Sequence, residues 1–216
     1  MKKSIFIILL LTLLVGCATT APVREALKED LKVPAGKIEE NQFFGLRYPF
    51  NVSVPSNWKM TMEFPDFLEE QGYDKPSPMD KEQTELYAYN PETKSNIQFD
   101  FTPAGRYATF DQKKIEWLTT AATESLKSEL EKEYGQGVVK VEVGPTEPVF
   151  LKGVQFAAKK YVTYAVKGMK REQGWIYGFT EPYQIFILYM VLEKDGVNDR
   201  QDLKKILDSF EVIQKK

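Results

Sequence analysis

The most informative segment of the sequence is IFILYMVL (residues 185–192), an unbroken run of eight apolar residues. Crossing a membrane as a helix takes roughly 17–25 apolar residues, so this run is too short for a membrane span. A strand with one face in water would alternate apolar and polar residues, and this segment does not alternate. It therefore predicts a central β-strand over residues 184–193 that is covered on both faces.

Two amphipathic helices, over residues 111–134 and 198–210, are predicted to cover that strand. Their apolar residues recur at spacings of three and four, which places them on one helix face. Asp111 or Thr109 can cap the start of the first helix, and Gly135 lies where a helix terminator is expected. The apolar positions are Ile115, Leu118, Ala122, Leu126 and Leu130 in the first helix, and Leu203, Ile206, Leu207 and Phe210 in the second.

The remaining strands are expected to pair with the central one in an antiparallel sheet. Phe50, Val52 and Val54 alternate with polar residues, and so do Ile97, Phe99 and Phe101. The predicted strands are 50–54, 84–90, 95–102, 138–150, 154–167, 171–180 and 184–193. An antiparallel sheet flanked by helices is an α+β fold, here an α/β/α sandwich in a single domain.

The composition excludes several classes of function. The chain of 216 residues has 29 Lys and Arg against 31 Asp and Glu, a net charge of −2, whereas nucleic-acid binding normally needs a positive excess. It has no His and one Cys, which excludes Ser-His and Cys-His nucleophile pairs and imidazole zinc sites. We therefore expect a protein that is not an enzyme, that binds no nucleic acid, and that has no cofactor and no metal site.

The N-terminus has the pattern of a secretory signal: Lys2 and Lys3, then an apolar run over residues 5–15, then a small residue. The segment Leu14-Val15-Gly16-Cys17 resembles the lipobox of bacterial lipoproteins. The resemblance implies cleavage after residue 16 and modification of Cys17 with fatty acyl chains such as palmitate. We expect a lipid-anchored protein of the cell envelope, on the periplasmic face of the outer membrane if the cell is Gram-negative.

Residues 17–41 are small, charged and nearly free of aromatic side chains, so they are predicted to be a flexible tether. The predicted organisation is a signal peptide over residues 1–16, the acylated Cys17 and tether over residues 17–41, and a folded domain over residues 42–216.

The folded region resembles the PsbP-like superfamily. The resemblance rests on Tyr48-Pro49-Phe50-x-Val52-x-Val54-Pro55-x-x-Trp58 at the front and on Ile206-Leu207-Asp208-Ser209-Phe210 at the end. It covers residues 43–212, with a helix and a β-meander between the two motifs in the expected order. It implies a binding or assembly role, with no shared active site.

The candidate partner-binding segment is residues 63–83, a long loop punctuated by prolines. Such loops on a rigid scaffold often carry binding residues. Phe64, Phe67 and Tyr73 are its predicted anchors. The carboxylates of the same segment, which include Glu69, Glu70 and Asp74, are read as a solvated loop surface.

Two further clusters keep alternatives open. Lys159, Lys160, Lys167, Lys170 and Arg171 surround one predicted hairpin and could form a partner or phosphate patch, although solubility and edge protection explain them as well. Trp175, Tyr177 and Phe179 share one strand face and pack under a helix or line an apolar pocket. The sequence favours a binding or assembly module for another envelope protein. The alternative is a carrier or sensor of an apolar or lipid ligand held between sheet and helix.

Overall fold

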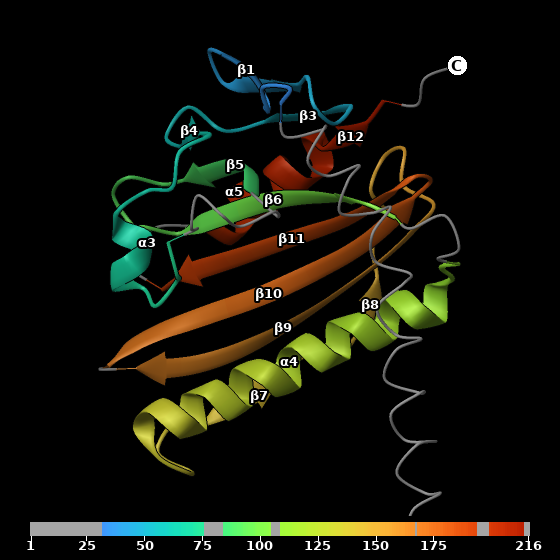
Figure 1. Ribbon diagram of the computed structural model, residues 1–216. Coiled ribbons are helices and arrows are strands. Elements are labelled where there is room, and N and C mark those ends of the chain that lie inside the picture. Colours follow the sequence, from blue (N-terminus) through green and yellow to red (C-terminus); the bar gives the residue numbers. More distant parts are fainter. Residues whose placement is uncertain (1–31, 76–83, 105–108, 167, 194–198, 214–216) are drawn as a thin grey trace, which may run out of the picture.

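A computed structural model describes residues 32–75, 84–104, 109–166, 168–193 and 199–213. Its largest element is an eight-stranded antiparallel sheet (Figure 1). The strands are β4 (Lys59–Thr61), β5 (Thr84–Tyr89), β6 (Asn96–Pro103), β7 (Val141–Val143), β8 (Glu147–Pro148), β9 (Phe156–Val166), β10 (Met169–Thr180) and β11 (Tyr183–Leu192). Their order is β4-β5-β6-β11-β10-β9-β7, and β8 pairs with β9 beside β7.

The apolar run over residues 185–192 forms β11, which pairs with β10 on one side and with β6 on the other. Ile185 and Ile187 are buried in the main core, while Phe186 and Leu188 point to the other face and contact a second apolar cluster. The prediction of a central strand is confirmed; one face is buried in the main core, and the other is only partly covered.

Helix α4 (Gln112–Tyr134) covers one face of the sheet, over β9 and β10 (Figure 1). The side chain of Asp111 accepts a hydrogen bond from the backbone N–H of Lys114 at 2.8 Å, so it is the N-cap. Ile115 and Leu130 are buried under the helix, with Leu126 partly buried between them. The helix boundaries agree with those expected from the apolar spacing.

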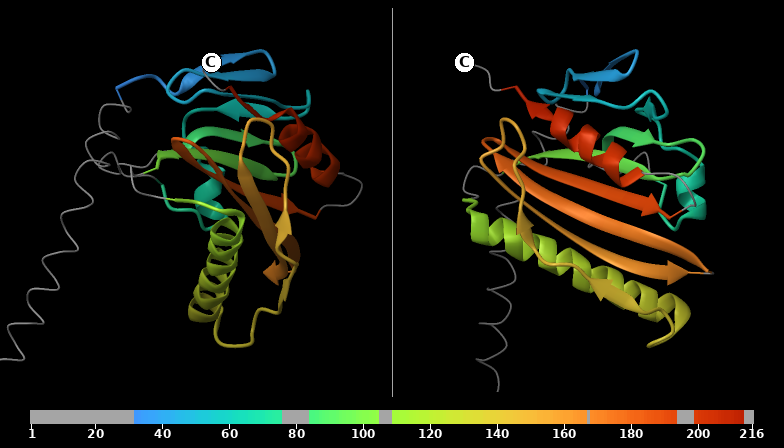
Figure 2. Two further views of the ribbon diagram at one scale, coloured as in Figure 1. Left: turned by 90° about the vertical axis from the view of Figure 1, so that its right-hand side faces the viewer. Right: turned by 180° about the vertical axis from the view of Figure 1, so that it is seen from behind.

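The opposite face is covered by helix α5 (Asp199–Ser209) and by a second, smaller sheet (Figure 2). This sheet has the order β1-β2-β3-β12, from β1 (Gly36–Glu39), β2 (Gln42–Gly45), β3 (Phe50–Ser53) and β12 (Glu211–Val212). Phe50 stacks on Phe101 with ring centroids 4.5 Å apart, and Phe99 stacks on Phe210 at 5.7 Å. The expected sandwich is thus corrected in one respect, since a small sheet shares this cover with the helix.

The folded domain begins earlier than the sequence pattern predicted. Residues 36–41, assigned to the tether, form β1 and its turn to β2, and β1 pairs antiparallel with β2. Gly36 is buried against the ring of Phe43, where a Cβ atom would lie only 2.4 Å from the ring. A glycine is required for this close approach, which a reading by hydrophobicity does not detect.

Residues 1–31 lie outside the described ranges, and with them the predicted signal peptide and Cys17. Among the described residues, no helix has the length and apolar character needed to cross a membrane.

Candidate functional site

A cleft of about 770 Å³ opens on the α4 face of the large sheet. One wall is the C-terminal half of α4, and the other is helix α3 (Phe67–Glu70) with the residues that follow it. The floor is formed by side chains of β9, β10 and β11. The site therefore lies where α3 and α4, as two separate covers, leave part of the sheet open.

Strand β10 supplies most of the polar floor. Arg171, Gln173, Trp175 and Tyr177 all line the cleft, because alternate residues of a strand point to the same face. Lys170 and Glu172 point to the other face, where Glu172 contacts Arg200 of α5 and Lys170 contacts Glu193. Alternate polar residues of β10 thus contribute to two separate sites: one set lines the cleft, and the other lies on the opposite face of the sheet.

Three tyrosines lie around Arg171 at one end of the cleft. Tyr73 follows α3, Tyr134 ends α4, and Tyr164 on β9 is the cross-strand neighbour of Arg171. The Tyr164 hydroxyl donates to Oε1 of Gln173 at 2.8 Å. Burial raises the pKa of both Tyr73 and Tyr164 above the usual value of a tyrosine. Both hydroxyls therefore stay neutral at physiological pH, when they can donate hydrogen bonds.

Two buried polar atoms of this cluster have no hydrogen-bond partner within the described part of the chain: the Tyr73 hydroxyl and Nε of Arg171. The Arg171 Nη1 group donates to the backbone carbonyl of Gln71, but at 3.5 Å this bond is long. Buried polar groups are nearly always hydrogen-bonded, since leaving them unpaired costs about 1–3 kcal/mol. This end of the cleft therefore presents donors that a bound group can use.

Arg171 differs in this respect from the other arginines that the structure describes. Arg47 pairs with Glu85 at 2.9 Å in a buried ion pair, and Arg200 pairs with Glu172 at 2.7 Å. No carboxylate in the described ranges forms an ion pair with Arg171. Among the described residues, its positive charge is therefore not balanced by an ion pair.

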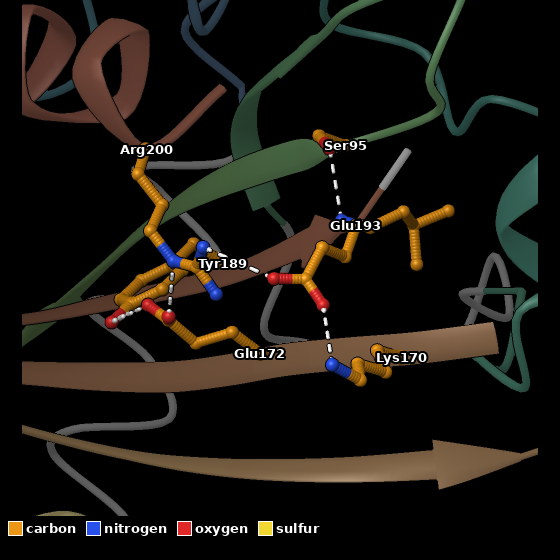
Figure 3. A network of polar contacts seen from close by, with 7 residues as sticks. Ser95, Lys170, Glu172, Tyr189, Glu193 and Arg200 are labelled. Carbon is orange, nitrogen blue, oxygen red and sulfur yellow. Dashed lines mark hydrogen bonds and ion pairs between the residues drawn. The ribbon is translucent and has the colours of Figure 1, made fainter. Parts of the chain in front are cut away.

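On the opposite face of the hairpin formed by β10 and β11, Arg200 is the centre of a network of polar contacts (Figure 3). Glu172 accepts from Arg200 and from the Tyr189 hydroxyl, the latter at 3.4 Å. Glu193 pairs with Lys170 at 3.4 Å and with Arg200 at 3.6 Å. These contacts join the start of β10 and the end of β11 to α5.

Acidic side chains line both walls of the cleft. They are Glu69, Glu70 and Asp74 on the α3 side, and Glu129 and Glu133 on α4. Glu129 and Glu133 lie one turn apart on the exposed face of the helix. We call these five residues the acidic rim. Over the part of the chain that the structure describes, no three Asp, Glu or Cys side chains gather closely enough to hold a metal ion.

Of the three predicted anchors of the 63–83 segment, only Tyr73 lines the cleft. Phe64 packs edge-on against Tyr87 with ring centroids 5.8 Å apart, and Phe67 packs on Tyr89 at 5.1 Å. Both rings are half-buried, so they attach the segment to β5 and are not free surface anchors. Residues 76–83 of the predicted segment lie outside the described ranges.

Four of the five cations expected around one hairpin lie in the described ranges, and the structure does not gather these four into one patch. Lys159 pairs with Glu147 at 3.3 Å, and Lys160 donates to the Thr146 hydroxyl at 3.0 Å. In the register of β9 and β10, Lys159 faces Ile176 while Arg171 faces Tyr164, so they lie at different ends of the strand pair. Lys170 and Arg171 point to opposite faces. Lys167 lies outside the described residues.

The aromatic row of β10 is largely filled by packing. Trp175 is buried with Leu130 and Val162, and Phe179 stacks on Phe110 with ring centroids 4.7 Å apart. Only Trp175 and Tyr177 of the row line the cleft. The row thus serves mainly as core beneath α4.

Several residues of the cleft were not singled out from the sequence: Tyr134, Tyr164, Gln173, Glu129 and Glu133. Only Gln173 had a signal in the sequence, the alternation Arg171-x-Gln173-x-Trp175-x-Tyr177. Polar side chains on the helix-covered face of a central strand indicate either a ligand or a network. The convergence of the three tyrosines depends on the tertiary structure and has no local signature.

No family model matches the sequence, and no curated protein matches it. The fold is similar to the solution structure of cyanobacterial PsbP (CyanoP) from Synechocystis sp. PCC 6803, with a TM-score of 0.50 and 12% identity, covering 80% of this chain and 91% of that chain. A crystal structure from Bacteroides thetaiotaomicron is also similar, with a TM-score of 0.47 and 10% identity, covering 82% of this chain and 50% of that one. The chain has a PsbP-like α+β fold.

Proposed function

We propose that this chain is a lipid-anchored, non-catalytic binding module that holds a segment of another envelope protein in the cleft between α3, α4 and the large sheet. The observation that carries the proposal is a pair of buried donors, on Arg171 and Tyr73, that line this cleft and have no hydrogen-bond partner among the described residues. Arg171 lies on β10, and the backbone N–H of Tyr73 donates to the carbonyl of Leu68 at 3.0 Å, so both residues are attached to regular elements of the fold. Preformed polar groups in a concave site are typical of binding sites.

The size and lining of the cleft favour a segment of a partner protein over an apolar ligand. Its volume of about 770 Å³ lies within the range of about 300–1,000 Å³ that is usual for ligand sites. The acidic rim and the Arg171 end make much of the lining charged or polar. A lipid tail would leave those groups without water or hydrogen bonds, at a cost in free energy. A polar peptide segment can pair with them.

The proposals on anchoring and catalysis rest on the sequence. Two or three acyl chains on Cys17 would hold the protein at a membrane, whereas one chain gives only marginal binding. The modified Cys17 would leave no free thiol, and the chain contains no His. We therefore place this protein in the cell envelope as a binding or assembly subunit.

Native mass spectrometry of the acylated protein, released gently from its own membrane, tests this proposal. We expect a mass increase on Cys17 from the acyl chains and a stoichiometric complex with a second protein. An unmodified Cys17 would contradict the anchor. A bare monomer would contradict the binding module, and a non-covalent adduct of lipid mass would favour a lipid carrier in its place.

A further inference from the structure

We infer that the cleft recognises a carboxylate that lies next to a positive charge in the partner protein, with Arg171 and Tyr73 binding the carboxylate and the acidic rim binding the adjacent cation. The inference rests on the proposed function, because it names the chemistry of the segment that the cleft would hold. Different residues of the cleft would bind the two halves of the ligand.

The carboxylate half is argued from Arg171. A guanidinium binds a carboxylate through two parallel N–H groups, and such charge-assisted bonds are about twice as strong as neutral ones. Within the described ranges, Nε of Arg171 is buried without a hydrogen-bond partner, and no carboxylate pairs with this side chain. The buried hydroxyl of Tyr73 lines the same cleft and likewise has no partner in those ranges. These donors are matched by an acceptor with a negative charge and at least two oxygen atoms.

The cationic half is argued from the balance of charge around the cleft. One guanidinium faces the five carboxylates of the acidic rim. A ligand with negative charge alone would be repelled by the rim as it approached Arg171. Like charges a few ångströms apart repel by about 1–4 kcal/mol at the effective dielectric constants of water and protein surfaces. A Lys or Arg beside the ligand carboxylate would turn this repulsion into attraction and would fix the orientation of the segment.

The carboxylate could belong to a chain end or to an Asp or Glu side chain, and three synthetic peptides separate these sources. The first is acetyl-Ala-Lys-Ala-Lys-Ala with a free C-terminal carboxylate. The second is the same peptide with a C-terminal amide. The third is also amidated but has Glu in place of the central Ala. Their binding to the full acylated chain in detergent micelles is measured by isothermal titration calorimetry.

We expect at least one carboxylate peptide to bind about tenfold more tightly than the peptide without a carboxylate, since a charged hydrogen-bonded pair discriminates by that factor or more. Arg171→Gln is expected to abolish this preference. Lys170→Gln removes the same charge from the adjacent residue on the opposite face, so it is the matched control and is expected to keep the preference.

Tyr73→Phe provides a second test that does not depend on the folding of Arg171→Gln. It is expected to weaken binding of the preferred peptide about threefold or more while leaving the fold intact. Equal affinity of all three peptides, or no binding by any of them, would overturn the inference. A preference that survives both Arg171→Gln and Tyr73→Phe would overturn it as well. If the peptides fail in this way but mass spectrometry finds a protein partner, the ligand chemistry is wrong and the proposed binding function is still supported. The failure of one can therefore be told from the failure of the other.

Discussion

Replacing Tyr73 by Phe is expected to raise the stability of the fold. The hydroxyl is buried and has no hydrogen-bond partner in the described part of the chain, whereas in the unfolded chain it bonds to water. A buried polar group without a partner costs about 1–3 kcal/mol. Removing one oxygen atom keeps the ring and nearly all of its packing. We therefore expect the free energy of unfolding to increase by about 1–2 kcal/mol, the lower part of that range.

Tyr164→Phe is the matched control for this substitution. Its hydroxyl lies in the same cleft but donates to Oε1 of Gln173 at 2.8 Å. Deleting it leaves a buried acceptor unpaired, so the free energy of unfolding should fall by about 1–3 kcal/mol. One chemical change at two neighbouring positions is thus predicted to have opposite effects.

Urea unfolding followed by tryptophan fluorescence measures both variants. For Tyr73→Phe the midpoint should rise at an unchanged slope, since the surface exposed on unfolding is the same. For a domain of this size, the melting temperature should rise by about 2–4 °C for each kcal/mol. If Tyr73→Phe were as destabilising as Tyr164→Phe, the Tyr73 hydroxyl would be satisfied in the free protein. The Tyr73 hydroxyl would then not be a free donor for a ligand in the cleft.

Three further predictions concern the core, the pH dependence and the anchor. Phe99→Ala should lower the free energy of unfolding by about 3–5 kcal/mol, because the ring is fully buried between Phe50 and Phe210; chemical denaturation checks this. Burial alone would raise the pKa of Asp202, but hydrogen bonds from Lys205, Asn57 and Trp58 lower it below 3.8. These hydrogen bonds stabilise the fold above pH 3.8, and their contribution is lost as the pH falls through the lowered pKa. Asp202→Asn should therefore lower the free energy of unfolding at pH 7. Denaturation curves should show that the difference from wild type shrinks below pH 3.8. Cys17→Ser should move the protein from the membrane fraction to the soluble fraction, and unchanged membrane association would contradict lipid anchoring.

The large sheet and its helices could be predicted from the sequence because their signals are local and long. The apolar run of β11 and the spacing of apolar residues in α4 each extend over several turns or pleats, so the period is unambiguous. The α5 helix carries the same signal over a shorter length.

The small sheet could not be predicted in full for the opposite reason. Its strands have two to four residues each, and β1 carries only Ile38 as an apolar side chain of appreciable size. Such segments form strands because they pair with neighbours, as β12 pairs with β3 across most of the chain length. Tertiary pairing decides their structure, and the local sequence records little of it.

The candidate site was only partly accessible from the sequence. Tyr73 was identified because a long loop suggested binding, but Phe64 and Phe67 were expected to act with it and instead pack on β5. The cluster around Arg171 takes Tyr73, Tyr134 and Tyr164 from segments that are far apart in the chain. Whether an arginine has a carboxylate partner depends on this three-dimensional arrangement, which no spacing rule supplies.

Site-specific photo-crosslinking in living cells tests whether the cleft binds a partner protein through Arg171. Benzoylphenylalanine replaces Ser125 on the cleft wall or, as a control, the exposed Lys204 on α5, in chains with and without Arg171→Gln. We expect a crosslink to one other envelope protein from position 125, none from position 204, and loss of the crosslink when Arg171 is replaced. A crosslink that is equally strong from both positions, or that persists without Arg171, would show that the partner does not bind in the cleft through Arg171.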